Sequence, residues 1–284
     1  MAKLRQKVLT KFVGFLGVIF MVLWTLAAIA PVAISLLASV KPRKEIIASP
    51  LSWPEEFAFD NYSRAWSGTN LGEPWLTFAT NSVISTTIGV LTGVGLGVLA
   101  GYATGRSKTN FGSIVNRYFL LLITLPFVVT WIPLFVLSDR LGVLSNPWVL
   151  GAMYGGRLVP FTAVMMRAYF ASFPLDLIEA ANLDGASEWT SFRRVVMPLS
   201  WGGVIAVGLV NFIFLWNELG LAQVLLLDPG SRTLPPGLSQ FRGQFSVDFG
   251  ALYASLVITV VPIIVLFSFT QKKLTEGLRA GAMK

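Results

Sequence analysis

The stretch that decides the fold runs from Ser172 to Pro198 and reads SFPLDLIEAANLDGASEWTSFRRVVMP. Six charged residues fall within it, so it cannot cross a bilayer, although the apolar runs on both sides are long enough to do so. The six are Asp176, Glu179, Asp184, Glu188, Arg193 and Arg194. We therefore expect the segment 172–198 to be a water-facing loop between two membrane spans.

This loop is predicted to hold two short helices separated by a glycine turn. Pro174 suits a first helical turn, because its missing N–H would be unpaired there, and no breaker follows before Gly185. Ser187 can cap a second helix, whose apolar residues recur at helical spacing until Pro198 ends the pattern. The charged side chains are left to face water or a partner protein. On these residues alone, a solvated hairpin without a partner is an equal alternative.

Composition places the whole chain in a membrane. Of its 284 residues, 54% are hydrophobic and 13% are charged, and the mean hydropathy is +0.69. An ordinary soluble domain has about 25% charged residues. The net charge of +8 comes from basic residues near the ends of apolar runs, which is a topology signal and disfavours nucleic-acid binding. The chain lacks cysteine and histidine, which disfavours a redox or metal-dependent membrane enzyme.

Six transmembrane helices are expected in this all-α protein, at about residues 12–40, 79–104, 118–138, 146–170, 199–227 and 249–270. Fourteen of the 22 Lys and Arg residues then fall on segments expected to be cytoplasmic, counting Arg167 at the inner end of the fourth span. These segments include the N-terminus (1–11) and the C-terminal tail (271–284), in agreement with the positive-inside rule. The aromatic-rich segment 41–78 is expected to lie against the outer membrane surface.

Two features inside the spans predict how the helices pack. Glycine recurs at every fourth residue from Gly89 to Gly105, which favours the close approach of another helix over direct ligand contact. Pro126 and Pro133 lie within the third span and suggest kinks, either near a cavity or in a packed region without a function.

The loop also carries a family resemblance. Glu179-Ala180-Ala181, Asp184-Gly185-Ala186, Phe192, Val195 and Pro198 resemble the EAA loop of permease subunits of bacterial ABC importers, in the sugar-importing branch related to the maltose permease. The resemblance implies the type I importer permease fold, in which this loop forms a coupling helix seated in a cleft of a cytoplasmic ATPase subunit. Carried over by position, the coupling residues are Glu179, Ala180, Ala181, Asp184, Gly185 and Ala186.

The C-terminal tail, QKKLTEGLRAGAMK at 271–284, resembles the end of the second permease subunit in maltose-type importers. In that system the tail reaches into the ATPase dimer, which implies contacts through Glu276, Gly277 and Gly281. A basic tail that binds anionic lipid is the alternative. Asp60-Asn61-Tyr62 and Trp216-Asn217-Glu218 also resemble short family motifs.

Charged groups at bilayer depth cost at least about 2.5 kcal/mol, so they are normally paired or turned to a water-filled cavity. Arg157 lies near the middle of the fourth span, and Glu218 lies in the fifth. Arg157 is a candidate solute contact, and pairing with Glu218 or with a partner subunit is the alternative. For Glu218, a packing and hydrogen-bond node is an equal alternative. The candidate substrate path comprises Arg157, Asn217, Glu218, Asn211, Asn81 and Trp131.

The resemblance implies partners as well. They are a second permease, with a heterodimer expected, two ATP-binding subunits that hold ATP and Mg, an extracytoplasmic binding protein, membrane lipid and a sugar-type solute. The chain has no G-x-x-x-x-G-K-[ST] phosphate loop, so we expect no ATP hydrolysis, no enzyme activity and no cofactor in this subunit of a bacterial inner membrane. A secondary transporter or channel is the alternative, and it is disfavoured because no internal inverted repeat is apparent.

Overall fold

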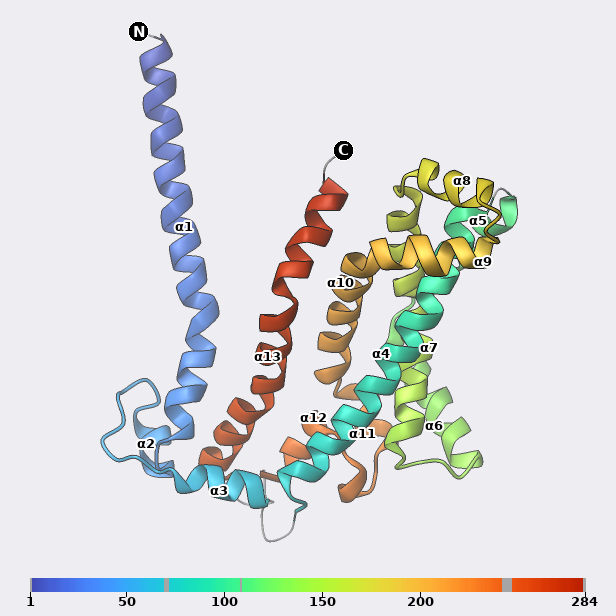
Figure 1. Cartoon of the computed structure of the whole chain (residues 1–284). Coiled ribbons are helices and arrows are strands. Elements are labelled where there is room, and N and C mark those ends of the chain that lie inside the picture. Colours follow the sequence, from blue (N-terminus) through green and yellow to red (C-terminus); the bar gives the residue numbers. More distant parts are fainter. Residues whose placement is uncertain (1, 69–71, 108, 242–246, 283–284) are drawn as a thin grey trace. The chain divides into compact units, whose positions relative to one another are not determined.

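A computed structural model describes residues 2–68, 72–107, 109–241 and 247–282, apart from the side chains of residues 2–12, 175 and 272–282. The secondary-structure elements of these residues are all helical (Figure 1). The chain falls into two compact units, and each is described by itself. The first comprises Met1–Asn70 with Gln240–Ile258, and the second comprises Leu71–Ser239 with Thr259–Lys284.

Five described helices are long and apolar enough to cross a membrane: Val13–Ser39 of α1 (Ala2–Ser39), α4 (Trp75–Arg106), α7 (Pro147–Ala171), the run Glu188–Trp216, and Phe249–Gln271 of α13 (Phe249–Ala282). A sixth span results if the bent pair Asn110–Thr124 and Phe127–Arg140 is taken as one. This confirms the predicted all-α membrane architecture.

The third predicted span, 118–138, is a broken helix. Helix α5 (Asn110–Thr124) ends before Leu125, which is extended. A 3₁₀ turn (Phe127–Thr130) then leads into α6 (Trp131–Arg140). The segment Phe127–Arg140 is bent by 90° relative to α5. Pro126 explains the break, since a proline disfavours helical backbone in the residue before it. The predicted kink is therefore present at Pro126.

The fifth predicted span, 199–227, differs at both ends. The prediction that Pro198 halts the preceding helix is wrong, because α9 (Glu188–Ser191) continues through a π turn (Phe192–Val196) into α10 (Met197–Trp216). The wider π turn accommodates the missing N–H and the ring of Pro198. The span then ends at Trp216, and a turn and the short helix α11 (Gly220–Leu225) occupy most of the remaining predicted residues.

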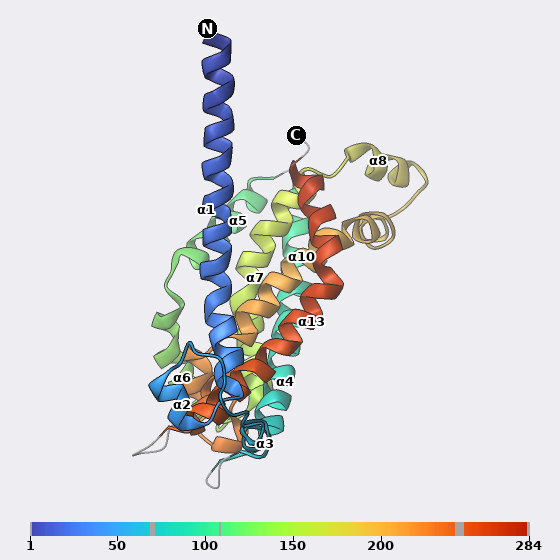
Figure 2. The same cartoon turned by 90° about the vertical axis from the view of Figure 1, so that its left-hand side faces the viewer.

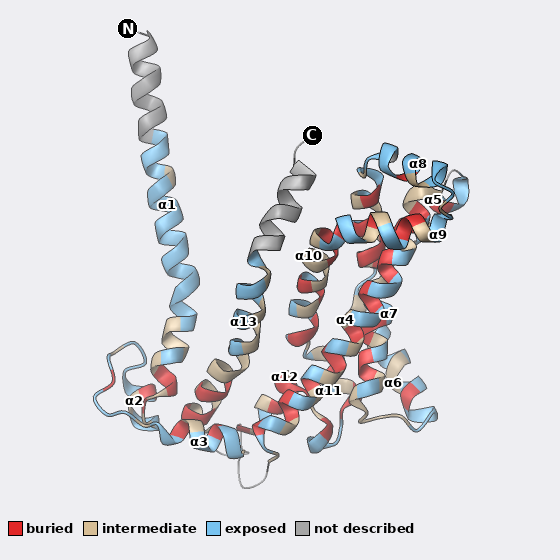
Figure 3. Cartoon of the chain, viewed as in Figure 1, coloured by how far each residue is buried: buried red, intermediate tan, exposed pale blue. Residues whose placement is uncertain are grey.

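In the second unit, α4 and α7 pack closely along the glycine series, and α10 runs beside them (Figures 1 and 2). A Cβ atom at Gly93 would lie 2.6 Å from Leu158 Cβ, and one at Gly101 would lie 2.9 Å from both Met166 Cβ and the Ala163 carbonyl. Side chains at these positions would push the helices apart. The packing role predicted for the glycines is therefore confirmed, and Figure 3 shows buried residues along these helices.

The two ends of the α4, α7 and α10 group carry different elements (Figure 1). The hairpin of α8 (Leu175–Leu183) and α9 lies at one end. Helices α6, α11 and α12 (Leu234–Gly237) lie at the other, with the 3₁₀ turn Pro229–Ser231 between the last two in sequence.

In the first unit, two short helices follow α1 along the chain, α2 (Arg43–Ala48) and α3 (Asp60–Ser67), and polar side chains of this region are linked by hydrogen bonds. The amide of Asn61, 1% exposed, donates to the carbonyls of Ser39 and Lys41, both at 2.9 Å. Arg64 pairs with Asp60 and with Asp248. Burial tends to lower the pKa of the Arg64 guanidinium, yet hydrogen bonds and Coulomb attraction from the two carboxylates raise this pKa above its usual value. All three residues of Asp60-Asn61-Tyr62 thus make hydrogen bonds in this unit, since Tyr62 also meets the Ser39 hydroxyl, at 2.8 Å.

Candidate functional site

Helix α8 of the hairpin is anchored in the second unit through its buried side chain Ile178. Ile178 is 2% exposed and packs in a cluster with Tyr102, Phe170 and Phe192. The ring centroids of Tyr102 and Phe192 are 4.5 Å apart, and Tyr102 meets Phe170 edge to face at 5.5 Å. Helix α8 therefore rests on an aromatic platform built from α4, α7 and the π turn.

The turn between the two helices is set by backbone hydrogen bonds. The Ala186 N–H donates to the Ala181 carbonyl and the Gly185 N–H to the Asn182 carbonyl, both at 3.0 Å, which closes α8 with a Schellman motif. Gly185 has a φ of +80°, a conformation that favours glycine. The Ser187 hydroxyl then accepts from the Thr190 N–H at 3.3 Å. Both the glycine stop and the Ser187 cap predicted from the sequence are confirmed.

The outer surface of this hairpin carries the residues assigned to coupling. Glu179, Ala180, Asp184 and Gly185 are exposed, and Ala181 and Ala186 are partly exposed. Leu183 is 89% exposed and Trp189 60%, so large apolar side chains stand among the polar ones. A groove of about 520 Å³ runs between the two helices and is lined by Ala181, Asp184, Gly185, Ala186, Ser187, Thr190, Arg194 and Val195. The arrangement is a rigid backbone that presents a mixed polar and apolar surface.

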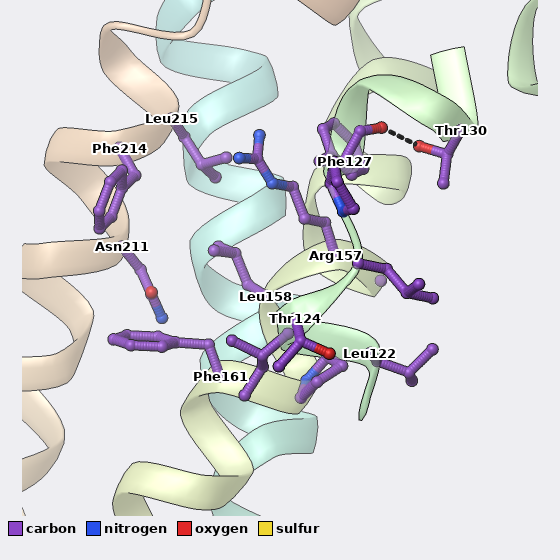
Figure 4. A pocket seen from close by; sticks show the side chains of 15 residues that line it. Leu122, Thr124, Phe127, Thr130, Arg157, Leu158, Phe161, Asn211, Phe214 and Leu215 are labelled. Atoms are coloured by element: carbon purple, nitrogen blue, oxygen red, sulfur yellow. Dashed lines mark hydrogen bonds between the residues drawn. The ribbon is translucent and has the colours of Figure 1, made fainter. Parts of the chain in front are cut away.

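A second site is a cavity of about 550 Å³ beside Arg157 (Figure 4). Its walls come from the break between α5 and α6, from α7 and from α10. The Arg157 guanidinium lies 3.9 Å from the ring centroid of Phe127, within the range of a cation–π contact. The lining residues are Leu122, Ile123, Thr124, Leu125, Pro126, Phe127, Thr130, Gly156, Arg157, Leu158, Pro160, Phe161, Asn211, Phe214 and Leu215.

Of the residues assigned to a substrate path, this cavity brings together Arg157 and Asn211. Asn211 is fully buried, and its amide N–H donates to the Thr162 hydroxyl at 2.8 Å. Its carbonyl oxygen has no hydrogen-bond partner within the described part of the chain. Asn211 therefore forms part of the closed wall of the cavity, whereas Arg157 is exposed to it.

Glu218 lies outside the cavity and organises the chain after α10. Its carboxylate accepts hydrogen bonds from Tyr154 Oη at 2.6 Å, from the Leu221 N–H at 2.8 Å and from the Ala222 N–H at 3.1 Å. It forms no ion pair with Arg157 among the residues described. These bonds favour the structural alternative for Glu218, a hydrogen-bond node that holds the first turn of α11.

The other three path residues also make local contacts. Asn81 donates from its amide to the carbonyls of Gly230 and Arg232, at 2.9 and 3.0 Å, and so tethers a loop. Asn217 donates to the Ile213 carbonyl of its own helix at 2.8 Å. The Trp131 ring lies so close to Gly220 that any side chain at position 220 would collide with it. The structure thus gives Asn81, Asn217 and Trp131 packing contacts and does not bring them to the cavity.

Sequence reasoning missed the aromatic walls of the cavity. Phe127, Phe161 and Phe214 come from three separate elements, and an apolar residue in a span does not reveal which neighbour it will face. Pro126 was the available signal, because the helix break that it marks is part of the lining. The tail residues Glu276, Gly277 and Gly281 lie outside the residues whose side chains are described.

Comparisons with known proteins agree with this architecture. The family model described as "Binding-protein-dependent transport system inner membrane component" matches residues 93–280. Two diacetylchitobiose uptake system permease proteins of Streptomyces coelicolor are similar to the chain. One is 30% identical and the alignment covers 93% of this chain and 87% of the relative; the other is 31% identical, with 97% and 95% covered.

A solved structure has the same fold. It is a crystal structure of a bacterial ABC transporter involved in the import of the acidic polysaccharide alginate. The TM-score is 0.78 at 21% sequence identity, and the match covers 93% of this chain and 97% of that one. The family match spans α7, the hairpin, α10 and the cavity wall, which are the elements described above. The chain belongs to the family of inner membrane components of binding-protein-dependent transport systems, and is a multi-pass permease subunit of an ABC importer.

Proposed function

We propose that this permease imports a carbohydrate or related polyhydroxy solute, using ATP hydrolysed by a separate subunit. The proposal for the solute rests on the two diacetylchitobiose permeases, which match nearly the whole chain. The proposal for the energy source rests on the family, whose transport systems include an ATPase, a solute-binding protein and a second permease. Within this assembly we assign to the chain one half of the translocation path.

The observation that best supports the coupling mechanism is that hydrogen bonds and a buried side chain fix the shape of the hairpin. A part that passes movement from one protein to another must not deform under load. The Schellman turn and the Ser187 cap close both ends of the turn, and Ile178 anchors α8 in the aromatic cluster. The exposed Glu179 and Asp184 are then available to an ATPase subunit, together with Ala180, Ala181, Gly185 and Ala186.

The assembly we propose has two distinct permeases, two ATPase subunits that bind ATP and Mg, and one external binding protein. The chain itself would bind no cofactor and catalyse no bond-making step. Both termini and the hairpin would lie on the cytoplasmic side, as the positive-inside rule indicates. The tail residues Glu276, Gly277 and Gly281 would add a second contact with the ATPase.

In this mechanism, closure of the ATP-bound ATPase dimer would move the hairpin, and α10 would carry that movement toward the membrane cavity. The helix is continuous from Glu188 to Trp216, and Asn211, Phe214 and Leu215 on it line the cavity. Movement of α10 would therefore change the walls around Arg157. ATP hydrolysis would reset the arrangement.

The coupling assignment is tested by combining Glu179→Ala with Gly185→Arg in the complete transporter. The first change removes an exposed carboxylate, and the second places a large side chain at a backbone φ of +80°. We expect ATP hydrolysis to continue while ATP-dependent uptake falls. Uptake by the double variant at the normal rate would remove the hairpin from the coupling mechanism.

The solute class is tested separately with the cognate binding protein. A binding screen on the purified receptor should return sugars or polyols, and uptake into proteoliposomes should require this chain, the receptor and ATP. A receptor that selects amino acids or metal ions would overturn the carbohydrate assignment.

A further inference from the structure

The cavity beside Arg157 carries an electrostatic imbalance. Arg157 lies at the centre of α7, and an arginine side chain remains ionised under all conditions that proteins encounter. The described residues that line the cavity include no Asp or Glu. Glu218 attracts Arg157, but it does not line the cavity and its carboxylate is already held by Tyr154 and by two backbone N–H groups. A cation in apolar surroundings without a carboxylate is costly unless something else supplies the negative charge.

The ring of Phe127 orients this cation without neutralising it. The guanidinium carbon lies 3.9 Å from the ring centroid, so the ring contacts the cation on one side. A guanidinium has five N–H donors arranged in its plane, and these stay available for an acceptor that approaches from the edge. Carboxylates match this geometry with two parallel hydrogen bonds. The contact with Phe127 thus leaves N–H donors of Arg157 for an anion in the cavity.

The remaining walls suit the body of a sugar. Phe161 and Phe214 supply aromatic surface. Thr124 and Thr130 supply hydroxyl oxygens that can accept from a solute, since their protons are donated to backbone carbonyls. The volume of about 550 Å³ falls in the range of typical small-molecule sites. A sugar ring presents apolar C–H faces and a rim of hydroxyls, so a ring carrying one acidic group matches all three kinds of lining.

We propose that this cavity is a subsite for an acidic carbohydrate, with Arg157 binding its carboxylate. The inference rests on the proposed function, because it takes the solute to be a sugar, and it adds that the sugar is anionic. Arg157 is then the residue that sets the preference for charge.

The test uses the absence of cysteine in this chain. Thr130→Cys introduces a single thiol into the lining, within the complete transporter embedded in nanodiscs of phosphatidylcholine, which contain no anionic headgroup. The thiol is reacted with an anionic and with a cationic methanethiosulfonate reagent, and modification is followed on this chain. After each rate is divided by the reagent's rate with a free thiol, we expect the anionic reagent to react faster, by about tenfold relative to the cationic one, because the positive charge of Arg157 lies nearby.

Glucuronic acid and glucose form the matched pair of probes, since they differ only in the carboxylate. We expect glucuronic acid to protect the thiol at a concentration about tenfold to a hundredfold lower than glucose, as for a hydrogen bond between charged groups. Arg157→Gln should abolish both the reagent preference and the advantage of glucuronic acid. Arg157→Lys keeps the charge and should retain part of both, which separates the loss of charge from misfolding.

Three results would overturn the proposal. Equal reaction of the two reagents would show that a partner subunit already neutralises Arg157. Equal protection by glucose and glucuronic acid would show a site without charge selection. Protection by added phosphatidylglycerol but not by glucuronic acid would assign the cavity to lipid. The labelling needs neither ATP nor the binding protein, so a failure of sugar uptake would count against the proposed function without deciding these results.

Discussion

The hairpin of α8 and α9 and the cavity beside Arg157 belong to the same unit but place their polar groups differently. The hairpin keeps one apolar side chain, Ile178, inside and its carboxylates outside, on a turn closed by backbone hydrogen bonds. The cavity has mostly apolar walls and holds one cation. Its walls come from separate elements, so small movements of α7 or α10 alter it. The hairpin is thus built locally, whereas the cavity is assembled from distant segments.

The largest loss of stability should come from disrupting the packing of α4 against α7, because α7 contributes to both the hairpin platform and the cavity wall. In Gly97→Leu the new side chain would collide with Thr162, and its Cβ would lie 3.2 Å from the backbone nitrogen of Ala163. We expect α4 and α7 to separate at a cost of about 3 kcal/mol or more, and the yield of intact complex to collapse. Gly95→Leu is the matched control, because position 95 on the same helix has no atom within 4 Å. Similar thermal unfolding midpoints for the two variants would contradict the packing described here.

A smaller effect is expected from loosening the hairpin alone. Ile178→Ala removes the anchor of α8 and should cost about 2 to 4 kcal/mol of local stability. Hydrogen exchange of residues 175–191 should accelerate while α7 stays protected. Leu183→Ala is the control, since Leu183 is 89% exposed and leaves no void. Unchanged exchange in Ile178→Ala would mean that the hairpin is held by something other than the aromatic cluster.

Glu218→Gln tests whether Glu218 has a structural role only, while Arg157 binds the solute. The amide keeps one acceptor oxygen and loses the ionised partner of Tyr154, at a cost of about 1 to 3 kcal/mol. Hydrogen exchange in α11 should rise, while the charge preference at the cavity stays as in the parent. Tyr154→Phe removes one of the three hydrogen bonds and should have a smaller effect on α11. A lost charge preference in Glu218→Gln would place Glu218 in the solute site.

The smallest effect concerns Gly185. No atom lies within 4 Å of a Cβ built there, so Gly185→Ala costs only the strain of a positive φ, about 1 kcal/mol. Gly185→Asn should cost less, because asparagine tolerates this conformation better. Gly208→Ala, in an open helical position, serves as the control and should be neutral or slightly stabilising. Thermal unfolding of the purified complex distinguishes these cases, and a loss in Gly185→Ala no larger than in Gly208→Ala would contradict the role of the turn.

The hairpin could be predicted from the sequence because its determinants are local. Pro174, Gly185 and Ser187 each act on their own neighbours, and the structure confirms the two helices and the turn. Pro198 misled the same reasoning, since a π turn lets the helix continue past it. The contact of the hairpin with an ATPase stays a prediction.

The cavity could be predicted only in part, because its determinants are distant in sequence. Arg157 was found from the cost of a charge in a span, and Pro126 from its effect on the helix. Asn81 was selected as a polar group in a span, but its partners, Gly230 and Arg232, lie about 150 positions further along the chain. No pattern near Asn81 contains that information. The assignment of Arg157 and Asn211 to a solute path likewise remains a prediction.

The unbroken helix from Glu188 to Trp216 has a mechanical consequence. Its 29 residues include the π turn Phe192–Val196, and Figure 1 shows that the helix changes direction between α9 and α10. No loop interrupts the backbone between the two directions, so a displacement of α9 passes directly into α10. One continuous helix thus begins beside the groove of the hairpin and ends at the wall that Phe214 and Leu215 give to the cavity, so a movement at one place is transmitted to the other.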